Sequence, residues 1–338
     1  MWQRKLQETL AKLVDSERGI LAADESIETV GQRFKLQGID NTEERRREYR
    51  ELLFSTPNVG RYLSGVIMFE ETLEQHDANG TKLVDVVRKQ GMVPGVKVDL
   101  GKGPLTGSPG DMISYGLDGL AERLEKYQQQ GACFAKWRSV YNITEHNPTS
   151  LALSANAEVL ARYAAECQAA GMVPIVEPEV LIDGNHSIHE AARVSEQVLH
   201  SVFHALHLHG VALEYVMLKP SMVTAGKAQG RSNPEEVAQA TLTCLRRTVP
   251  AAVPSINFLS GGQSPEEATA NINALNQSRP RPPWLLNLSF ARALQEPALR
   301  IWGGERQNRE RAQAVFLERA RLNSLALRGE YTEQMESG

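Results

Sequence analysis

Eight short apolar segments alternate with helical segments, and this alternation constrains the fold more than any other feature of the 338-residue chain. The segments begin about thirty to forty-five residues apart, which is typical of parallel strands joined by crossover helices. We therefore predict an α/β fold, a single-domain (β/α)8 TIM barrel over residues 1–338. A doubly wound sheet is the alternative, but no GxGxxG turn follows the first segment. The predicted strands are 19–24, 63–69, 93–99, 133–138, 173–179, 214–220, 255–259 and 284–290.

Helix signals lie between and around these strands. An amphipathic N-terminal helix is predicted at about 2–14, where leucines recur on one face, and Thr42 is a suitable N-cap for a charged helix over 42–56. A charged helix over 306–328 closes the fold. The acidic, polar segment at about 330–338 is predicted to be a mobile tail.

Charge and cysteine content favour a cytoplasmic protein. The net charge is -4, which does not favour a nucleic-acid or anionic-membrane partner. No apolar run approaches the length of a membrane span, and the first residues contain no apolar signal segment. Cys133, Cys167 and Cys244 form no CxxC pair and are odd in number, so a reducing compartment is expected.

One predicted strand, 214–220, ends on a lysine. Lys219 follows an apolar run, and Pro220 then ends the strand because proline has no N–H to donate. Burial disfavours the charged ammonium, and a neutral amine is a nucleophile toward carbonyl groups. Taken alone, the segment favours the simpler interpretation, a lysine whose stem is buried and whose amine reaches water.

Other polar residues also fall at predicted strand ends, which converge on one rim if the barrel closes. Neighbouring lysines raise the cost of charging one another, whereas Glu177 and Asp24 can balance that charge and move protons. A set of unrelated rim salt bridges is the alternative, but independent surface charges have no reason to select strand ends. The set is Asp24, Lys97, Lys136, Arg138, Glu177, Lys219, Ser260 and Arg292.

The segment 260–264, Ser-Gly-Gly-Gln-Ser, is a candidate phosphate site. Two glycines allow backbone N–H groups to approach an anion just before a helix begins, and this loop follows the seventh strand, a frequent phosphate position in such barrels. Arg292 can bind the same phosphate with its planar fork. Without the barrel, an ordinary glycine turn is the better interpretation.

Three histidines could suggest a metal site. His200, His204 and His207 share one face of a predicted helix, but they lie mid-helix, far from any strand end. A solvated helix face is the favoured interpretation, so no metal and no cofactor are predicted.

Seven motifs in order resemble class I fructose-1,6-bisphosphate aldolase, over about residues 5 to 305. They are LAADES (21–26), VKVD (96–99), FAKWR (134–138), VEPE (176–179), LKP (218–220), FLSGGQS (258–264) and RALQ (292–295). The resemblance implies a lyase of glycolysis and gluconeogenesis that cleaves fructose 1,6-bisphosphate to dihydroxyacetone phosphate and glyceraldehyde 3-phosphate. It also implies sugar-phosphate substrates and a homotetramer.

The resemblance implies a role for each catalytic residue. Lys219 would form a Schiff base with the ketose carbonyl, and Glu177 would move protons as the carbinolamine loses water. Lys136 would lie beside Glu177 and hold its charge, and Asp24 would take the proton of the C4 hydroxyl. For substrate binding it implies Ser260, Gly261 and Arg292 at the 1-phosphate, Ser26, Lys97 and Arg33 at the 6-phosphate, and Arg138 near the sugar.

The chain departs from the family pattern in three places. Thr29 replaces a serine on the 6-phosphate side, and Ala291 stands where a glycine usually precedes the phosphate-binding arginine. The animal enzymes end in a tyrosine, whereas this chain ends in Gly338. Its one tail tyrosine, Tyr331, either reaches the barrel mouth to assist proton transfer or packs on the closing helix.

Two other functions are weighed against this one. Another Schiff-base enzyme, a transaldolase or a deoxyribose-phosphate aldolase, would lack the two opposed phosphate sites expected here. A non-catalytic scaffold on an aldolase fold would tolerate loss of Lys219, Glu177 or Asp24, and all three are present.

Overall fold

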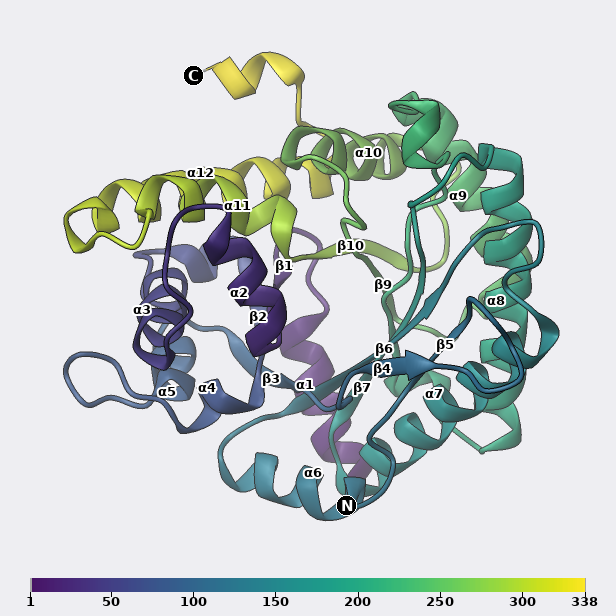
Figure 1. Cartoon of the computed structure of the whole chain (residues 1–338), viewed down its shortest axis with the longest axis horizontal. Coiled ribbons are helices and arrows are strands. Elements are labelled where there is room, and N and C mark those ends of the chain that lie inside the picture. The colour runs from purple at the N-terminus through teal and green to yellow at the C-terminus, as the bar shows by residue number, and fades with distance from the viewer. Residues whose placement is uncertain (1, 338) are drawn as a thin grey trace.

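Eight parallel strands close into a barrel in the computed structural model, which describes residues 2–337 (Figure 1). Each strand pairs with its neighbours in chain order, except that the hairpin β4–β5 stands outside the barrel, so the order is β1-β10-β9-β8-β7-β6-β3-β2. The predicted (β/α)8 barrel is confirmed. The strands are β1 Gly19–Ala23, β2 Leu63–Met68, β3 Val93–Lys97, β6 Phe134–Tyr141, β7 Val173–Val180, β8 Met217–Leu218, β9 Ser255–Phe258 and β10 Leu285–Phe290.

Helices surround the barrel where the apolar periodicity predicted them. Thr42 caps α3 by accepting a hydrogen bond from the Arg45 amide, and Ser264 caps α10 through a capping box with Glu267. No helix in the described range is both long and apolar enough to cross a membrane. The outer helices are α3 Glu43–Phe54, α5 Leu83–Lys89, α6 Leu120–Gln129, α7 Ser150–Ala170, α8 Ile188–Leu208, α9 Pro234–Thr248, α10 Pro265–Gln277 and α12 Arg309–Arg328.

Several short elements were not predicted from the sequence. Several of them follow strand ends at the mouth of the barrel, including α2 after β1, the hairpin β4–β5 after β3, and α11 after β10. The additional elements are α2 Ile27–Lys35, α4 Glu70–Glu74, β4 Lys102–Pro104, β5 Met112–Ser114, α11 Arg292–Trp302, and the 3-10 turns η1 Val59–Arg61, η2 Leu213–Tyr215, η3 Lys227–Gln229, η4 Arg306–Asn308 and η5 Glu333–Ser337.

The sixth barrel strand is much shorter than predicted. Residues 213–215 form the 3-10 turn η2, so β8 pairs with its neighbours only at Met217 and Leu218. Lys219 still continues the line of the strand, because its amide donates to the Val176 carbonyl of β7 at 2.8 Å. The closing helix likewise begins later than predicted, since residues 306–308 form η4.

The N-terminal helix α1, Trp2–Leu13, closes the amino-terminal end of the barrel. Leu6, Leu10 and Leu13 are buried, and they form one apolar cluster with strand residues that include Ile20 and Phe134. Each buried leucine contributes about 1.5–3 kcal/mol relative to exposure. This plug leaves the opposite end, where the strands finish, as the open one.

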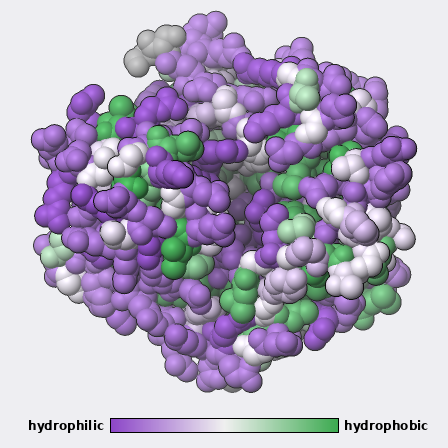
Figure 2. Space-filling view, viewed as in Figure 1, coloured by the Kyte–Doolittle hydropathy of each residue, from purple (hydrophilic) through white to green (hydrophobic). Residues whose placement is uncertain are grey.

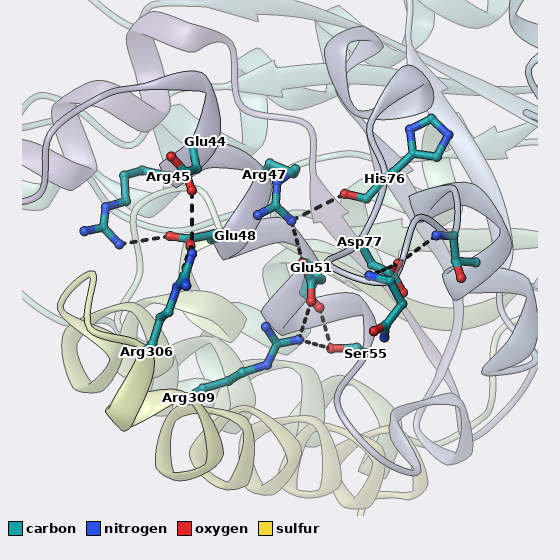
Figure 3. A network of polar contacts seen from close by, with 12 residues as sticks. Glu44, Arg45, Arg47, Glu48, Glu51, Ser55, His76, Asp77, Arg306 and Arg309 are labelled. Carbon is teal, nitrogen blue, oxygen red and sulfur yellow. Dashed lines mark hydrogen bonds and ion pairs between the residues drawn. The ribbon is translucent and has the colours of Figure 1, made fainter.

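Polar contacts join α3 to the last part of the chain (Figure 3). Glu48 accepts from Arg45 and from Arg306, each at 2.9 Å, and Glu51 accepts from Arg309 at 2.9 Å. Both carboxylates are buried, and each contacts more than one guanidinium, so these contacts are less screened than single surface pairs. The network holds residues 306–309 against α3.

The segment after α12 lies on α10 and α12. Tyr331 is buried, and its amide donates to Asn273 of α10 at 3.0 Å. Its hydroxyl donates to Glu336 at 2.8 Å, and Glu336 also accepts from buried Arg319 of α12 at 2.6 Å. These contacts hold Tyr331 against the outer helices, and it does not line the cavity described below.

Candidate active site

A cavity of about 1030 Å³ opens where the barrel strands end. Figure 2 shows a hollow near the middle of this face with hydrophilic residues around much of it. Every site residue predicted from the sequence lines this one cavity. They are Asp24, Ser26, Arg33, Lys97, Lys136, Arg138, Glu177, Lys219, Ser260, Gly261 and Arg292.

Lys219 lies at the floor of the cavity. Its side chain is 3% exposed, and its Nζ is 3.1 Å from Oε1 of Glu177. The hydrogen bond from its own amide to β7, the strand that carries Glu177, fixes the lysine backbone beside that carboxylate. A lysine in this position can exchange a proton with Glu177. It is an ammonium when it holds the proton and a neutral amine when Glu177 has taken it.

Lys136 of β6 joins this pair to a second carboxylate. Its Nζ is 2.6 Å from Asp24 Oδ2 and 3.2 Å from Glu177 Oε2, and all four groups of the cluster are buried. The cluster therefore runs Asp24–Lys136–Glu177–Lys219, with two carboxylates and two amines alternating. Alternation lets each buried charge contact an opposite one, which offsets the cost of removing it from water.

The electrostatics of the cluster favour its ionised form. Burial opposes ionisation of Asp24, but Lys136 and Lys219 outweigh burial and lower the pKa of Asp24 to about 2. Burial also opposes ionisation of Glu177, yet Lys136 and Lys219 lower its pKa below the ordinary value. Burial acts against charged Lys136, and the two carboxylates nevertheless raise its pKa. Both carboxylates are therefore proton acceptors at neutral pH.

The turn after β9 has features that could bind an anion on one side of the cluster. Gly261 and Gly262 have φ angles of 52° and 89°, a region that favours glycine, and within residues 2–337 their amides donate to no protein acceptor. The helix α11 begins beside them at Arg292 without a side-chain cap. Two open sets of N–H groups and a guanidinium thus face the cavity together.

The cations on the opposite side of the cluster are already paired. Lys97 contacts Asp99 at 2.7 Å. In the same region Arg138 pairs with Glu179, and Arg33 of α2 pairs with Glu25. Ser26 caps α2 by accepting from the Thr29 amide at 3.3 Å, and its hydroxyl also lies 3.0 Å from the Thr29 hydroxyl.

A model of the class I fructose-bisphosphate aldolase family matches residues 5–338. The chain belongs to this family. It is therefore a lyase, and the resemblance carried by the seven motifs is confirmed over almost the whole chain.

Individual relatives agree with the family match. The chain is 51% identical over 322 residues to the protein named fructose-bisphosphate aldolase 4, cytosolic, of Arabidopsis thaliana, covering 95% of this chain and 82% of the relative. It is 49% identical to aldolase B of Gallus gallus, covering 97% and 91%. The aldolase of Plasmodium falciparum, solved with TRAP and an inhibitor, superimposes with a TM-score of 0.96 at 46% identity, covering 98% of this chain and 96% of that one.

The structure shows how this aldolase accommodates its departures from the family pattern. Thr29 stands in the first turn of α2, and its hydroxyl lies 3.0 Å from the Ser26 hydroxyl, so it can replace a serine as a partner there. Ala291 precedes α11 with φ -102° and ψ -91°, so it does not occupy the positive-φ region that favours glycine. Neither change removes a polar group from the cavity.

The three histidines lie elsewhere. His200, His204 and His207 are exposed on α8, outside the cavity lining. Among residues 2–337, no group of three or more histidine, cysteine, aspartate or glutamate side chains is arranged to hold a metal ion.

Sequence reasoning missed the carboxylates that pair with the rim cations. Glu25, Asp99 and Glu179 are all buried and all line the cavity. Each stands inside a motif quoted for the resemblance, one or two residues from a predicted site residue. For Glu179 a signal was available, because it stands two residues after Glu177 in β7 and residues two apart in a strand face the same side.

Proposed function

We propose that the chain cleaves fructose 1,6-bisphosphate reversibly to dihydroxyacetone phosphate and glyceraldehyde 3-phosphate through a Schiff base on Lys219. The observation that carries the proposal is the buried chain of contacts Asp24–Lys136–Glu177–Lys219 at the floor of the cavity. It supports the proposal because two amines and two carboxylates in mutual contact can supply a nucleophile, a proton carrier and a separate base. The reaction belongs to glycolysis and gluconeogenesis.

The first half of the reaction uses Lys219 and Glu177. The neutral amine attacks the C2 carbonyl of the ketose and forms a carbinolamine. Glu177, 3.1 Å from the amine, carries two protons in turn. It takes one from the Lys219 ammonium before attack and gives it to the carbinolamine oxygen. It then takes one from the carbinolamine nitrogen and gives it to the hydroxyl, which leaves as water. The product is an iminium ion on Lys219, whose positive nitrogen attracts the electrons of the neighbouring bonds.

The second half breaks the C3–C4 bond. Asp24 takes the proton of the C4 hydroxyl, the C4 oxygen becomes the aldehyde oxygen, and the bonding electrons move into the iminium to give an enamine. A proton then returns to C3, and water hydrolyses the iminium to release dihydroxyacetone phosphate. Lys136 holds Asp24 and Glu177 ionised between these steps, since it contacts both.

The two sides of the cavity suit the two phosphates. On one side we assign the 1-phosphate to Ser260, Gly261 and Arg292, where open N–H groups and a guanidinium meet. On the other side we assign the 6-phosphate to Ser26 and Lys97, with the additional help of Arg33 and Arg138. The cations of this second side already hold carboxylates, so a phosphate there shares them with protein partners.

This arrangement favours the bisphosphate reaction over the alternative functions. A transaldolase or a deoxyribose-phosphate aldolase handles a substrate with one phosphate, whereas two anion sites flank Lys219 here. A scaffold without activity has no need to bury two amines and two carboxylates, because such burial costs stability unless every charge is paired.

We also propose that the protein is a cytoplasmic homotetramer. The tetramer rests on the resemblance to the family alone. The location is supported by two relatives of Arabidopsis thaliana, 51% and 50% identical, whose names include the word cytosolic. Light scattering coupled to size exclusion measures the assembly directly, and a mass of one or two chains at micromolar concentration contradicts the tetramer.

Chemical trapping tests the Schiff base. The protein is incubated with dihydroxyacetone phosphate and borohydride in the presence of EDTA, and the reduced adduct is located by peptide mass mapping. We expect one adduct, on Lys219, and none in Lys219→Arg, whose guanidinium is a poor nucleophile. An adduct on Lys97 or Lys136 with Lys219 unmodified contradicts the assignment. Loss of wild-type cleavage in EDTA points instead to metal chemistry.

A further inference from the structure

A lysine that the sequence reasoning did not select lies beside the anion site. Lys227 begins η3 in the loop after β8. Backbone hydrogen bonds hold this loop to the loop after β7: the Lys227 amide donates to the Ile182 carbonyl at 2.8 Å, and the Gly226 amide donates to the His186 carbonyl at 2.8 Å. The start of the lysine side chain is therefore fixed in position.

The end of that side chain reaches over the glycine turn. A Cβ placed on Gly262 would lie 3.9 Å from Lys227 Nζ and 3.2 Å from a terminal nitrogen of Arg292. The two nitrogens are thus no more than 7.1 Å apart, the sum of these distances. Lys227 approaches from the loop after β8 and Arg292 from the start of α11, so the two cations stand on different elements around one turn.

Neither cation has a carboxylate partner. Within residues 2–337, neither Lys227 nor Arg292 has an Asp or Glu oxygen within ion-pair distance. The opposite side of the cavity differs, because Lys97 holds Asp99 and Arg33 holds Glu25 there. Two like charges left unpaired at this distance repel each other, and a dianion placed between them would remove the repulsion.

We propose that Lys227 binds the 1-phosphate through its ammonium group, together with Arg292 and the amides of the glycine turn. This inference rests on the proposed function and adds a specificity-determining residue to it. Arg292 offers a planar fork to two phosphate oxygens, whereas an ammonium offers a compact charge to the remaining one. Lys227 therefore selects ketoses that carry a dianionic phosphate at C1.

Two substrates, fructose 1,6-bisphosphate and fructose 1-phosphate, show whether Lys227 acts on the 1-phosphate or on the 6-phosphate. Both carry the 1-phosphate, and only one carries the 6-phosphate. If Lys227 contacts the 1-phosphate, Lys227→Met lowers kcat/KM for both ketoses by the same factor, about five- to twentyfold, since an exposed charge-assisted contact lies at the weaker end of its range. The ratio of the two kcat/KM values stays at its wild-type value.

The experiment compares Lys227→Met with Lys227→Arg and with Lys89→Met. Lys89 is an exposed lysine in the last turn of α5. Neither Lys89 nor Lys227 lines the cavity itself, but only Lys227 is among the nearest contacts of a Cβ placed on Gly262. Lys227→Arg should retain most of the activity because it retains the charge, and Lys89→Met should match the wild type. The inhibition constant of inorganic phosphate, measured as a competitor, should rise in Lys227→Met by a similar factor and not in Lys89→Met.

Unchanged kinetics and unchanged phosphate inhibition in Lys227→Met overturn the inference and leave Lys227 as a solvated lysine. A loss confined to the bisphosphate overturns it as well, because it assigns the lysine to the 6-phosphate. The proposed function fails in a different way, through a wild-type protein that neither cleaves the ketoses nor traps on Lys219. In that event, direct titration of wild type and Lys227→Met with inorganic phosphate still decides whether Lys227 binds the anion.

Discussion

Replacing Lys136 by methionine tests the alternation of charges at the cavity floor. Methionine keeps much of the length of the side chain but removes the ammonium that lies 2.6 Å from Asp24 and 3.2 Å from Glu177. Glu177 retains Lys219 at 3.1 Å, whereas Asp24 loses its nearest counter-charge. Asp24 is 8% exposed, so water cannot replace the ammonium fully.

The expected magnitude follows from the pKa of Asp24. Its fall from the ordinary 3.8 to about 2 represents about 2 kcal/mol of stability above pH 4. Losing a close opposite charge raises a carboxyl pKa by about 1–3 units, so the pKa of Asp24 in Lys136→Met should reach about 5. At pH 7 the favourable contribution is then replaced by a penalty of about 2 kcal/mol, and the total loss is about 4 kcal/mol, within the range for a broken buried ion pair.

The sign of the pH dependence differs between the two proteins. In the wild type the Asp24 contribution is present above pH 4 and is lost only as pH falls toward 2. In the variant the folded-state pKa lies above the unfolded one, so the penalty is absent at low pH and grows as pH rises through about 5. The stability difference between the two should therefore shrink by about 1 kcal/mol from pH 7 to pH 4.

Urea unfolding at fixed protein concentration, at pH 4, 5.5 and 7, measures this difference. The double variant Lys136→Met with Asp24→Asn provides the control, because it removes the unpaired charge together with its partner. We expect it to be more stable than Lys136→Met at pH 7 and equally inactive. A loss that is independent of pH and is not restored by Asp24→Asn refutes the reasoning, and Lys136 then stabilises the barrel by packing alone.

Two further predictions concern other parts of the molecule. Arg292→Ala should lower kcat/KM for fructose 1,6-bisphosphate by about one to two orders of magnitude. It should affect analogues without a 1-phosphate much less. Equal losses of kcat/KM for all substrates would show that Arg292 has a structural role instead. Deleting residues 331–338 should lower the melting temperature, because Arg319 is buried and loses Glu336, but leave single-turnover cleavage within a few-fold. Collapse of cleavage with Schiff-base formation intact would show that Asp24 is not a sufficient base.

The barrel was predictable because its strands are buried on both faces and therefore read as apolar runs at a regular spacing. Elements around the mouth were not predictable in the same way. The helix α11 has no side-chain cap and contains Pro297, so it lacks both a start signal and an uninterrupted pattern. The helix α2 has nine residues with Gly31 in its middle, and its cap, Ser26, was assigned only to a phosphate.

Asp24, Lys97, Lys136, Glu177 and Lys219 were predicted from strand ends, whereas Ser26 and Arg33 came only from the family resemblance. The ion pairs between these residues were not predictable, because pairing depends on the register of the strands. Lys97 and Lys136 are register partners on adjacent strands, so two lysine side chains start from neighbouring positions. Each then needs its own carboxylate. Lys97 takes Asp99 from its own strand line, whereas Lys136 takes Asp24 and Glu177 from two other strands. This division keeps Lys97 on the side where the 6-phosphate is proposed to bind, and it leaves Glu177 in contact with both Lys136 and Lys219. The division depends on the register of several strands, which no single motif contains.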